Sequence, residues 1–260
     1  MMELEWRSHC DALNAEPDSE TTIPPELPAS FSLWRPRSAC PKCGHLISAW
    51  QNVPVISYLF LRGRCAACKT RISIRYPIVE AAAGLLSLLV ALRFGATPQV
   101  VAGLGFTWAL LVLAVIDIDR QLLPDSITLP LLWLGLLLSL IGRSGLFVDP
   151  TASIIGAVAG YLSLWLVFHL FKLVTGKEGM GYGDFKLLAA IGAWVGWQLL
   201  PLIILLSAVV GSIVGVALIV FGKHARQTPI PFGPYLAAAG WIALLWGPQL
   251  LTWYSALGRS

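Results

Sequence analysis

Long apolar runs separated by short polar loops are the sequence feature that most constrains this fold. Seven runs occupy residues 77–94, 98–119, 126–142, 152–175, 185–198, 199–222 and 232–254. Runs of about 17–25 apolar residues can cross a bilayer as helices, which satisfy every backbone hydrogen bond internally. Only 12% of the residues are charged, against about 25% in a typical soluble domain. We therefore predict an all-α polytopic membrane protein with about seven transmembrane helices, in which 185–198 is a tilted or incomplete span.

The sequence predicts three parts. Residues 1–31 are acidic and contain several prolines, which favours a poorly ordered segment. Residues 32–76 form a small basic module without Asp or Glu. Residues 77–260 contain all the apolar runs and form the expected transmembrane domain.

The distribution of Lys and Arg predicts the orientation in the bilayer. Short loops rich in these residues remain in the cytoplasm, which places the 32–76 module there. Alternating the spans from this module also puts the basic loops near Arg120, Lys186 and Lys223 inside, and puts the loops 95–97 and 143–151 outside. The net charge of +4 is too small to indicate a nucleic-acid partner.

Four of the five cysteines form two Cys-x-x-Cys knuckles, Cys40/Cys43 and Cys65/Cys68, separated by 21 residues. This spacing is typical of a tetrahedral structural zinc site. Disulfides or redox-active pairs are the alternative, but a cytoplasmic location disfavours disulfides. We predict a zinc-ribbon-like site, or a site for another thiolate-bound metal, with these four ligands. Its role is structural, because four thiolates leave no open coordination position.

Neighbouring residues refine this interpretation of the cysteine module. Gly44 and Gly63 suit tight turns beside the ligands. His45 is a competing ligand candidate, although a surface residue is the better interpretation. Cys10 receives no role.

Two carboxylate clusters lie at the ends of predicted spans. The first, at 116–125, contains three aspartates, and the second, at 179–186, ends in Gly-x-Gly-x-Gly-Asp-Phe-Lys with Asp184. A carboxylate inside a membrane helix costs about 2.5–3.5 kcal/mol on insertion scales and is therefore a functional candidate. Two spans separate the clusters, so both reach the same face of the membrane.

Asp117 is the best candidate in the first cluster. It shares a helical face with the small residue Ala114, which lets another helix approach, whereas Asp119 shares a face with bulky residues that suit lipid. For Asp119, an interfacial ion pair with Arg120 is the simpler interpretation. Asp125 is expected to cap the following helix.

A pair of neighbouring carboxyls can perform acid–base chemistry, because they resist double ionisation and share one proton. One then takes a proton from water while the other donates one, as in aspartic proteases. Gly181 and Gly183 leave room for a substrate backbone beside Asp184. A flexible loop that ends in an Asp helix cap is an equally good interpretation of that segment alone.

Two further classes compete with a protease. An ion- or proton-coupled transporter would place its carboxylates near the bilayer midplane on broken helices. The two clusters here lie at the inner boundary, which favours the protease. A zinc-containing scaffold without catalysis is the third possibility.

The segments 116–125 and 179–186, with the preceding cysteine module, resemble the type IV prepilin peptidases. The likeness extends over about residues 39–255 and includes the segments 75–80, 123–125 and 228–235. It implies an intramembrane aspartyl endopeptidase that cleaves leader peptides from type IV prepilins and type II secretion pseudopilins, at the cytoplasmic face of the bacterial inner membrane. It also implies Asp117 and Asp184 as catalytic residues and Cys40, Cys43, Cys65 and Cys68 as zinc ligands.

Many members of that family also methylate the new N-terminal residue with S-adenosylmethionine. Members usually begin with another apolar helix, which ends in a Gly-Ser-Phe-Leu-Asn-like stretch and an Arg-Leu-Pro. Nothing of that kind occurs before residue 32. We expect methylation to be the activity that this departure affects most, whereas the aspartate pair is retained.

Overall fold

The computed structural model describes residues 39–40, 42–48, 53, 56–141, 145–176, 179–221 and 231–257. The acidic segment 1–31 lies outside these residues. The chain divides into two compact units, Met1–Ala81 and Ala82–Ser260. The division falls inside a long helix, and each unit is described by itself.

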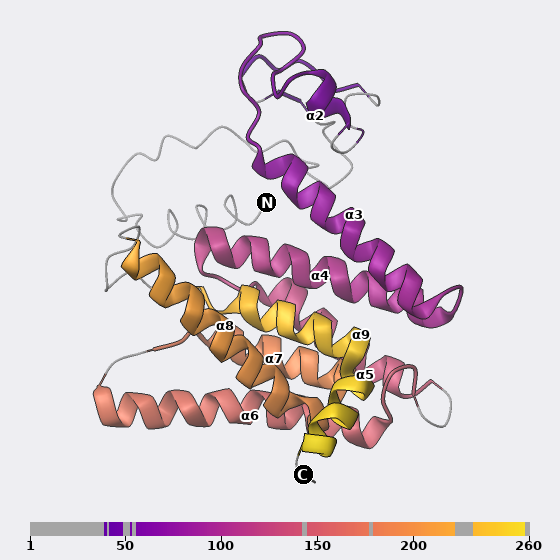
Figure 1. Ribbon diagram of the computed structural model, residues 1–260, viewed down its shortest axis with the longest axis vertical. Coiled ribbons are helices and arrows are strands. Elements are labelled where there is room, and N and C mark those ends of the chain that lie inside the picture. The colour runs from indigo at the N-terminus through magenta and orange to yellow at the C-terminus, as the bar shows by residue number, and fades with distance from the viewer. Residues whose placement is uncertain are drawn as a thin grey trace, which may run out of the picture. The chain divides into compact units, whose positions relative to one another are not determined.

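Helices form nearly all the regular structure of the described residues (Figure 1). In chain order they are α2 (Ile56–Phe60), α3 (Arg75–Phe94), α4 (Pro98–Arg120), α5 (Asp125–Ser139), α6 (Pro150–Thr175), α7 (Tyr182–Val195), the 3₁₀ helix η2 (Trp197–Leu199), α8 (Leu200–Val220) and α9 (Gly233–Leu257). Extended pairing within the described ranges is limited to two isolated β-bridges in the first unit. This confirms the predicted all-α class.

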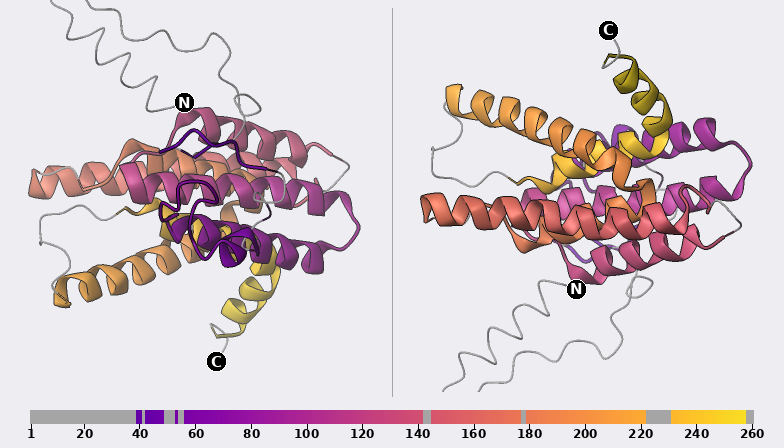
Figure 2. Two further views of the ribbon diagram at one scale, coloured as in Figure 1. Left: turned by 90° about the horizontal axis from the view of Figure 1, so that it is seen from above. Right: turned by 90° about the horizontal axis from the view of Figure 1, so that it is seen from below.

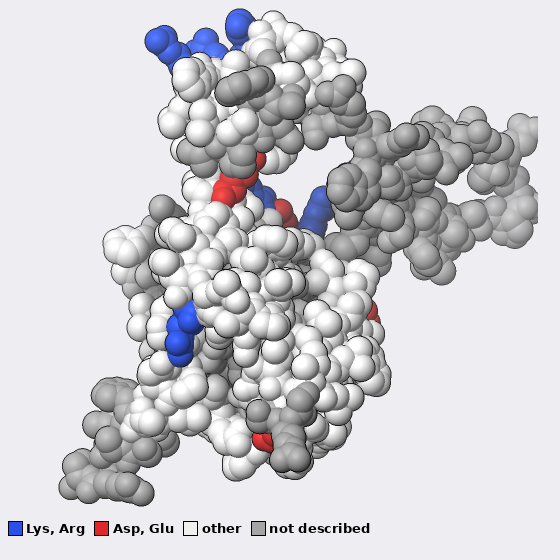
Figure 3. Space-filling model, turned by 90° about the vertical axis from the view of Figure 1, so that its right-hand side faces the viewer, with Lys and Arg blue, Asp and Glu red and all other residues white. Residues whose placement is uncertain are grey.

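The second unit has the surface of a membrane protein. Four of the described helices, α3, α4, α6 and the segment Trp197–Leu218, are long and apolar enough to cross a bilayer, and α5 is apolar but shorter. Large apolar side chains are exposed along these helices, and Figure 3 shows a broad face with few charged residues. Seven helices coincide with the seven predicted runs, but a total of seven membrane crossings stays a prediction.

The short helix α7 lies inside the second unit, where it packs against α5, α6 and α9. Between Asp184 and Val195 every residue except Lys186 is buried. The helix ends at Gly196, whose φ of +82° suits glycine, and η2 then leads into α8. Because α7 is enclosed on all sides, it contacts other helices, whereas the longer helices also expose large apolar side chains.

Small residues bring α6 and α7 into close contact. Gly156 of α6 faces Gly192 of α7 so closely that a Cβ on either glycine would collide with the backbone of the other. A Cβ on Gly160 would likewise lie 2.6 Å from the Leu188 carbonyl oxygen. Close backbone approach at small residues is the usual way in which membrane helices associate.

Hydrogen bonds from polar side chains hold α7 against the neighbouring helices α6 and α5. The Ser153 hydroxyl donates to the Ala193 carbonyl at 2.6 Å, joining α6 to α7. Trp194 Nε1 donates to the Leu131 carbonyl of α5 at 2.8 Å. These bonds satisfy polar groups in an apolar interior and set the position of α7 relative to the two helices.

Helix α9 packs against α4 and α7. Trp241 Nε1 of α9 donates to Thr107 Oγ1 of α4 at 3.0 Å. Farther along, α9 contains Pro248 and bends in its C-terminal part (Figure 2). The straight N-terminal part of α9 therefore packs against α4 and α7, near the carboxylates.

Replacing Gly156 with alanine should destabilise the protein by about 1–3 kcal/mol, because the new methyl group has no space between α6 and α7. Thermal unfolding in detergent measures the effect. Gly105→Ala is the matched control, since a Cβ added there would have nothing within 4 Å and alanine favours a helix interior. Equal melting temperatures for the two variants would contradict the proposed packing.

Candidate active site and metal centre

Asp117 lies in the last turn of α4 and faces the interior of the second unit. Leu110 and Leu113, on the same helical face, are buried, and Asp117 itself is only 5% exposed. Asp119 is exposed on the other face, together with bulky residues such as Trp108. The arrangement agrees with the expected difference between the two faces of α4.

The backbone N–H of Gly233, at the start of α9, donates a hydrogen bond to Asp117 Oδ2 at 3.0 Å. A Cβ at residue 233 would lie 2.7 Å from this oxygen, so the contact requires glycine. No role for Gly233 was expected from the sequence. The available signal was a glycine between Phe232 and Pro234, at the point where an apolar run begins.

Asp184 lies in the first turn of α7, and the residue is 8% exposed. Gly181 is the N-cap residue of that helix, so the alternative interpretation of Asp184 as the cap is wrong. Its Oδ1 atom is buried and has no hydrogen-bond partner among the described residues. A buried oxygen without a partner is rare, and it marks Asp184 as a candidate for a role other than a structural one.

Asp117 and Asp184 line the same cavity of about 740 Å³. The walls come from the end of α4, the turn before α5, the glycine-rich segment before α7 and the residues before α9. Besides the two aspartates they comprise Gln121, Leu122, Leu123, Pro124, Asp125, Gly179, Met180, Gly181, Tyr182, Gly183, Lys186, Pro231 and Phe232. Two carboxyls from helices far apart in sequence thus share one opening.

Leu123 is the packing residue between the two carboxylate segments. It is buried, and it fills the space beside two glycines: a Cβ on Gly183 would lie 2.8 Å from Leu123 Cβ, and one on Gly233 would lie 3.4 Å from its Cδ1. The turn that follows Asp117 is therefore seated directly against the segment that precedes Asp184.

The two glycines that were predicted to admit a substrate have different surroundings. Gly181 is exposed, and a Cβ added to it would meet only the backbone N of Gly183, at 4.0 Å. Gly183 is tightly packed against Leu123. Open space at Gly181 suits an approaching substrate, whereas Gly183 also has a packing reason to be glycine.

Asp125 does not cap α5, contrary to the expectation from sequence. Pro124 is the N-cap residue, and Asp125 is the first helical residue without a capping hydrogen bond. Its carboxylate instead pairs with Lys186 of α7, whose Nζ lies 2.8 Å from Oδ1 and 2.7 Å from Oδ2. The long-range ion pair replaces the local bond that the sequence suggested.

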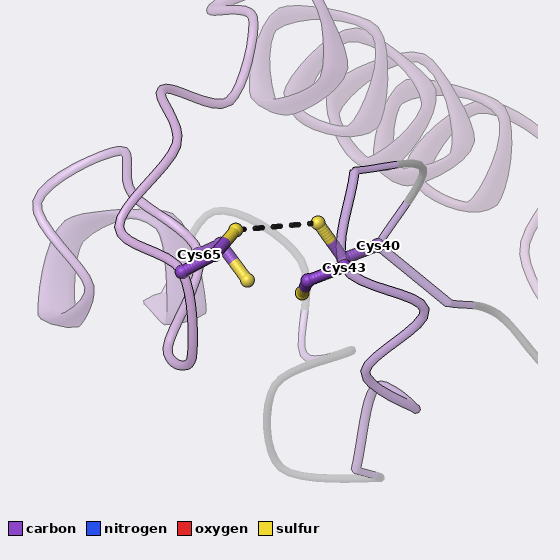
Figure 4. A group of neighbouring side chains, drawn as sticks. Cys40, Cys43 and Cys65 are labelled. Carbon is purple, nitrogen blue, oxygen red and sulfur yellow. Dashed lines mark hydrogen bonds between the residues drawn. The ribbon is translucent and has the colours of Figure 1, made fainter.

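The four predicted metal ligands of the first unit converge. The Sγ atoms of Cys40, Cys43, Cys65 and Cys68 all lie within 4.8 Å of one another, and none is in a disulfide. Figure 4 shows Cys40, Cys43 and Cys65 reaching toward a common centre from two loops. The Cys40 and Cys68 sulfurs are 3.8 Å apart, which matches the spacing of roughly 3.8 Å for tetrahedral thiolates about 2.3 Å from zinc.

The two knuckles have the same backbone hydrogen bonds. Cys40 N–H donates to the His45 carbonyl, and Cys65 N–H donates to the Thr70 carbonyl five residues on. In each knuckle, the residue four positions after the first cysteine donates its N–H to the carbonyl of that cysteine. This residue is Gly44 after Cys40 and Lys69 after Cys65, and both have a positive φ. The second knuckle thus has lysine at the position that corresponds to Gly44, and Gly63, just before this knuckle, has a positive φ as well.

The four thiols differ in acidity. Hydrogen bonds with the side chain and backbone of Thr70 lower the pKa of Cys68 to about 6, whereas the pKa of Cys43 is raised to about 11, with burial and the neighbouring cysteines as the raising causes. His45 is exposed and lies outside the group of candidate ligands. The donor set therefore fits a metal bound by four thiolates.

Together, the helices and the sites define a membrane protein with two buried aspartates on one cavity and a cluster of four cysteines suited to binding a metal. The type IV leader peptidase family matches residues 104–216, and the bacterial peptidase A24 N-terminal domain matches residues 19–94. No solved structure matches the chain.

Three relatives cover nearly the whole chain, and each is called a prepilin leader peptidase/N-methyltransferase. The one from Stutzerimonas stutzeri is 55% identical over 100% of this chain and 86% of its own length. Those from Pseudomonas aeruginosa and Aeromonas hydrophila are 55% and 51% identical, over 98% of this chain and 84% and 85% of their lengths. The chain therefore belongs to the type IV leader peptidase family, as its motifs suggested.

Replacing Cys65 with serine should abolish stoichiometric metal binding, because a tetrahedral thiolate site loses one of its four ligands. Metal content of the purified full-length protein, measured by plasma mass spectrometry, checks this. Cys10→Ser is the control and should retain the wild-type metal content. Equal metal content in the Cys65→Ser variant and the wild type would rule out this site.

Proposed function

We propose that this protein is an intramembrane aspartyl endopeptidase that cleaves leader peptides from type IV prepilins and pseudopilins, with Asp117 and Asp184 as its catalytic pair. The observation that carries the proposal is the placement of both buried carboxyls, from α4 and α7, on the wall of one cavity. The substrate class comes from the family and from the names of the relatives.

The chemistry follows from two carboxyls that share a proton. The ionised carboxylate removes a proton from water, and the water oxygen attacks the carbonyl carbon of the scissile peptide bond. The protonated carboxyl donates its proton to the carbonyl oxygen. Collapse of the tetrahedral intermediate breaks the C–N bond, and the leaving amine takes a proton from the carboxyl that received one from water. The other carboxyl, now ionised, takes the proton of one hydroxyl of the intermediate as its C=O bond re-forms, which restores the starting protonation of the pair.

A hydrogen bond orients Asp117 for this reaction. The Gly233 N–H holds Asp117 Oδ2 in a fixed orientation, while the other carboxylate oxygen stays free of this bond. Asp184 Oδ1 is buried without a partner among the described residues, unlike a structural carboxylate, which is normally hydrogen-bonded. Preorganised groups of this kind avoid the cost of rearrangement during the reaction.

The cavity can hold an extended peptide segment. The exposed backbone at Gly181 leaves space on one side, and apolar walls are formed by Leu122, Met180 and Phe232. We infer that the substrate passes Gly181 and that the reacting carbonyl lies between Asp117 and Asp184. Gly183 supports this position by seating Leu123 against the segment before α7.

We further propose that the enzyme N-methylates the amine that cleavage releases, as the names of its relatives indicate for those proteins. In this reaction S-adenosylmethionine would supply the methyl group. Cleavage must come first, since the nitrogen is part of a peptide bond until then.

The proposed location is the bacterial inner membrane, with the cysteine module and the cavity on the cytoplasmic side. The exposed basic residues of the described module, which include Arg62, Arg64 and Arg71, support this orientation. We assign the module's metal as zinc with a structural role, because four thiolates occupy every position of a tetrahedral site.

The alternative of an ion- or proton-coupled transporter receives no support from the family or the relatives. A transporter would place its carboxylates near the midplane on interrupted helices. Asp117 lies in the last turn of α4 and Asp184 in the first turn of α7, and both face one cavity.

Replacing Asp117 or Asp184 with asparagine should lower the rate of leader cleavage about 10³-fold or more, because each variant removes one half of the proton exchange. Purified enzyme in detergent, incubated with a prepilin and followed by mass spectrometry, measures the rate. Asp119→Asn removes the same charge from the exposed face of α4 and should cleave normally. A wild-type rate for either catalytic variant would refute the assignment.

Replacing Gly181 with alanine should leave the melting temperature near that of the wild type, because the free enzyme has room for a methyl group there. The same variant should raise KM, because the methyl group would occupy space that the substrate needs. Gly183→Ala should instead lower the melting temperature, because its methyl group collides with Leu123. Steady-state kinetics and thermal unfolding separate the two. Unchanged kinetics for Gly181→Ala would show that the substrate backbone passes elsewhere.

A further inference from the structure

One ion pair on the cavity wall has no place in the chemistry described so far. Lys186 Nζ contacts both carboxylate oxygens of Asp125, at 2.8 and 2.7 Å. Asp125 is the first residue of α5, and Lys186 lies in the second turn of α7. Both residues line the same cavity as the aspartate pair.

Stability does not explain this pair. The Lys186 and Asp125 side chains are 31% and 52% exposed, and ion pairs open to water contribute little to stability. Farther along the same two helices, Trp194 already donates to the Leu131 carbonyl, and a Cβ on Gly135 would lie 2.5 Å from the Trp194 ring. The helices are therefore held together without the ion pair, which acts only at their cavity ends.

The position of the pair in the chain indicates its effect. Asp125 ends the short turn that follows the helix of Asp117, and Lys186 comes two residues after Asp184. Leu123 lies within this turn and packs against Gly183. The ion pair thus joins the two segments that directly follow these carboxyls, and it holds the turn that contains Leu123 against the start of α7.

We propose that the Asp125–Lys186 ion pair is a positioning element that fixes the catalytic carboxyls, Asp117 and Asp184, relative to each other. The proposal rests on the peptidase function proposed above. Neither Asp125 nor Lys186 exchanges protons with the substrate. Their bidentate contact restrains the start of α5 against the first turns of α7, and so it restrains the separation on which proton exchange depends.

Two other roles for these residues make different predictions. If Lys186 tuned Asp184 by its charge, removing Lys186 and removing the Asp125 charge would shift the pH–rate profile in opposite directions. If Asp125 bound a cationic group of the substrate, Asp125→Asn would raise KM and Lys186→Met would not. A positioning pair lowers kcat in both variants and leaves KM and the pH optimum in place.

A double-mutant cycle on the full-length enzyme tests the proposal, with Asp125→Asn, Lys186→Met and the double variant assayed on a prepilin. Each single variant should lose about 10- to 100-fold in kcat, which is the typical effect of a small misplacement of reacting groups. The double variant should lose no more than the worse single variant, because the two residues act as one unit. Lys186→Arg should retain most of the activity, since arginine can also bind a carboxylate through two hydrogen bonds.

Asp119→Asn is the matched control for loss of one negative charge near the same end of α4, and it should keep the wild-type kcat. Melting temperatures of all variants should stay close to that of the wild type. Any one of four outcomes would overturn the positioning role. In the double variant, the fold-losses in kcat of the two single variants could multiply; in the single variants, the pH–rate profiles could shift in opposite directions, KM could change in Asp125→Asn alone, or kcat could stay at the wild-type value in both. Absence of cleavage by the wild-type enzyme would instead refute the proposed peptidase function.

Discussion

The backbones of α6 and α7 meet at Gly156 and Gly192, where neither helix has a side chain to keep them apart. This contact lets α7 lie inside the second unit, enclosed by longer helices that face lipid. A buried α7 in turn carries Asp184 away from lipid and into a cavity that Asp117 also lines. Larger residues at the α6–α7 contact would displace the helix that bears one of the two carboxyls.

Much of this arrangement is readable from the sequence, because it depends on local patterns. Apolar runs gave the helices to within a few residues, and the spacing of the cysteines predicted the cluster of four sulfurs. The choice of Asp117 over Asp119 followed from the residues one turn away, since small and bulky residues mark the packed and lipid-facing sides of a membrane helix. The structure buries the first and exposes the second.

Contacts between distant segments could not be read in the same way. Gly233 is 116 residues from Asp117, and Lys186 is 61 residues from Asp125, so no period or spacing connects either pair. Asp125 shows how a local rule fails: an aspartate at a helix start usually caps it, but Pro124 is the N-cap and the carboxylate turns to α7. Leu123 is equally ordinary in sequence, and its role depends on which two glycines it meets.

The hydrogen bond from Gly233 to Asp117 gives α9 a part in the proposed active site although it supplies neither aspartate. The ribosome makes the helix of Asp117 and the helix of Asp184 first, and α9 emerges after both. A nascent chain that has inserted only the earlier helices would have both acids but no N–H to orient Asp117. If the proposed pair is catalytic, proteolytic competence would thus be delayed until α9 has entered the membrane, and incomplete chains would not cleave during biosynthesis.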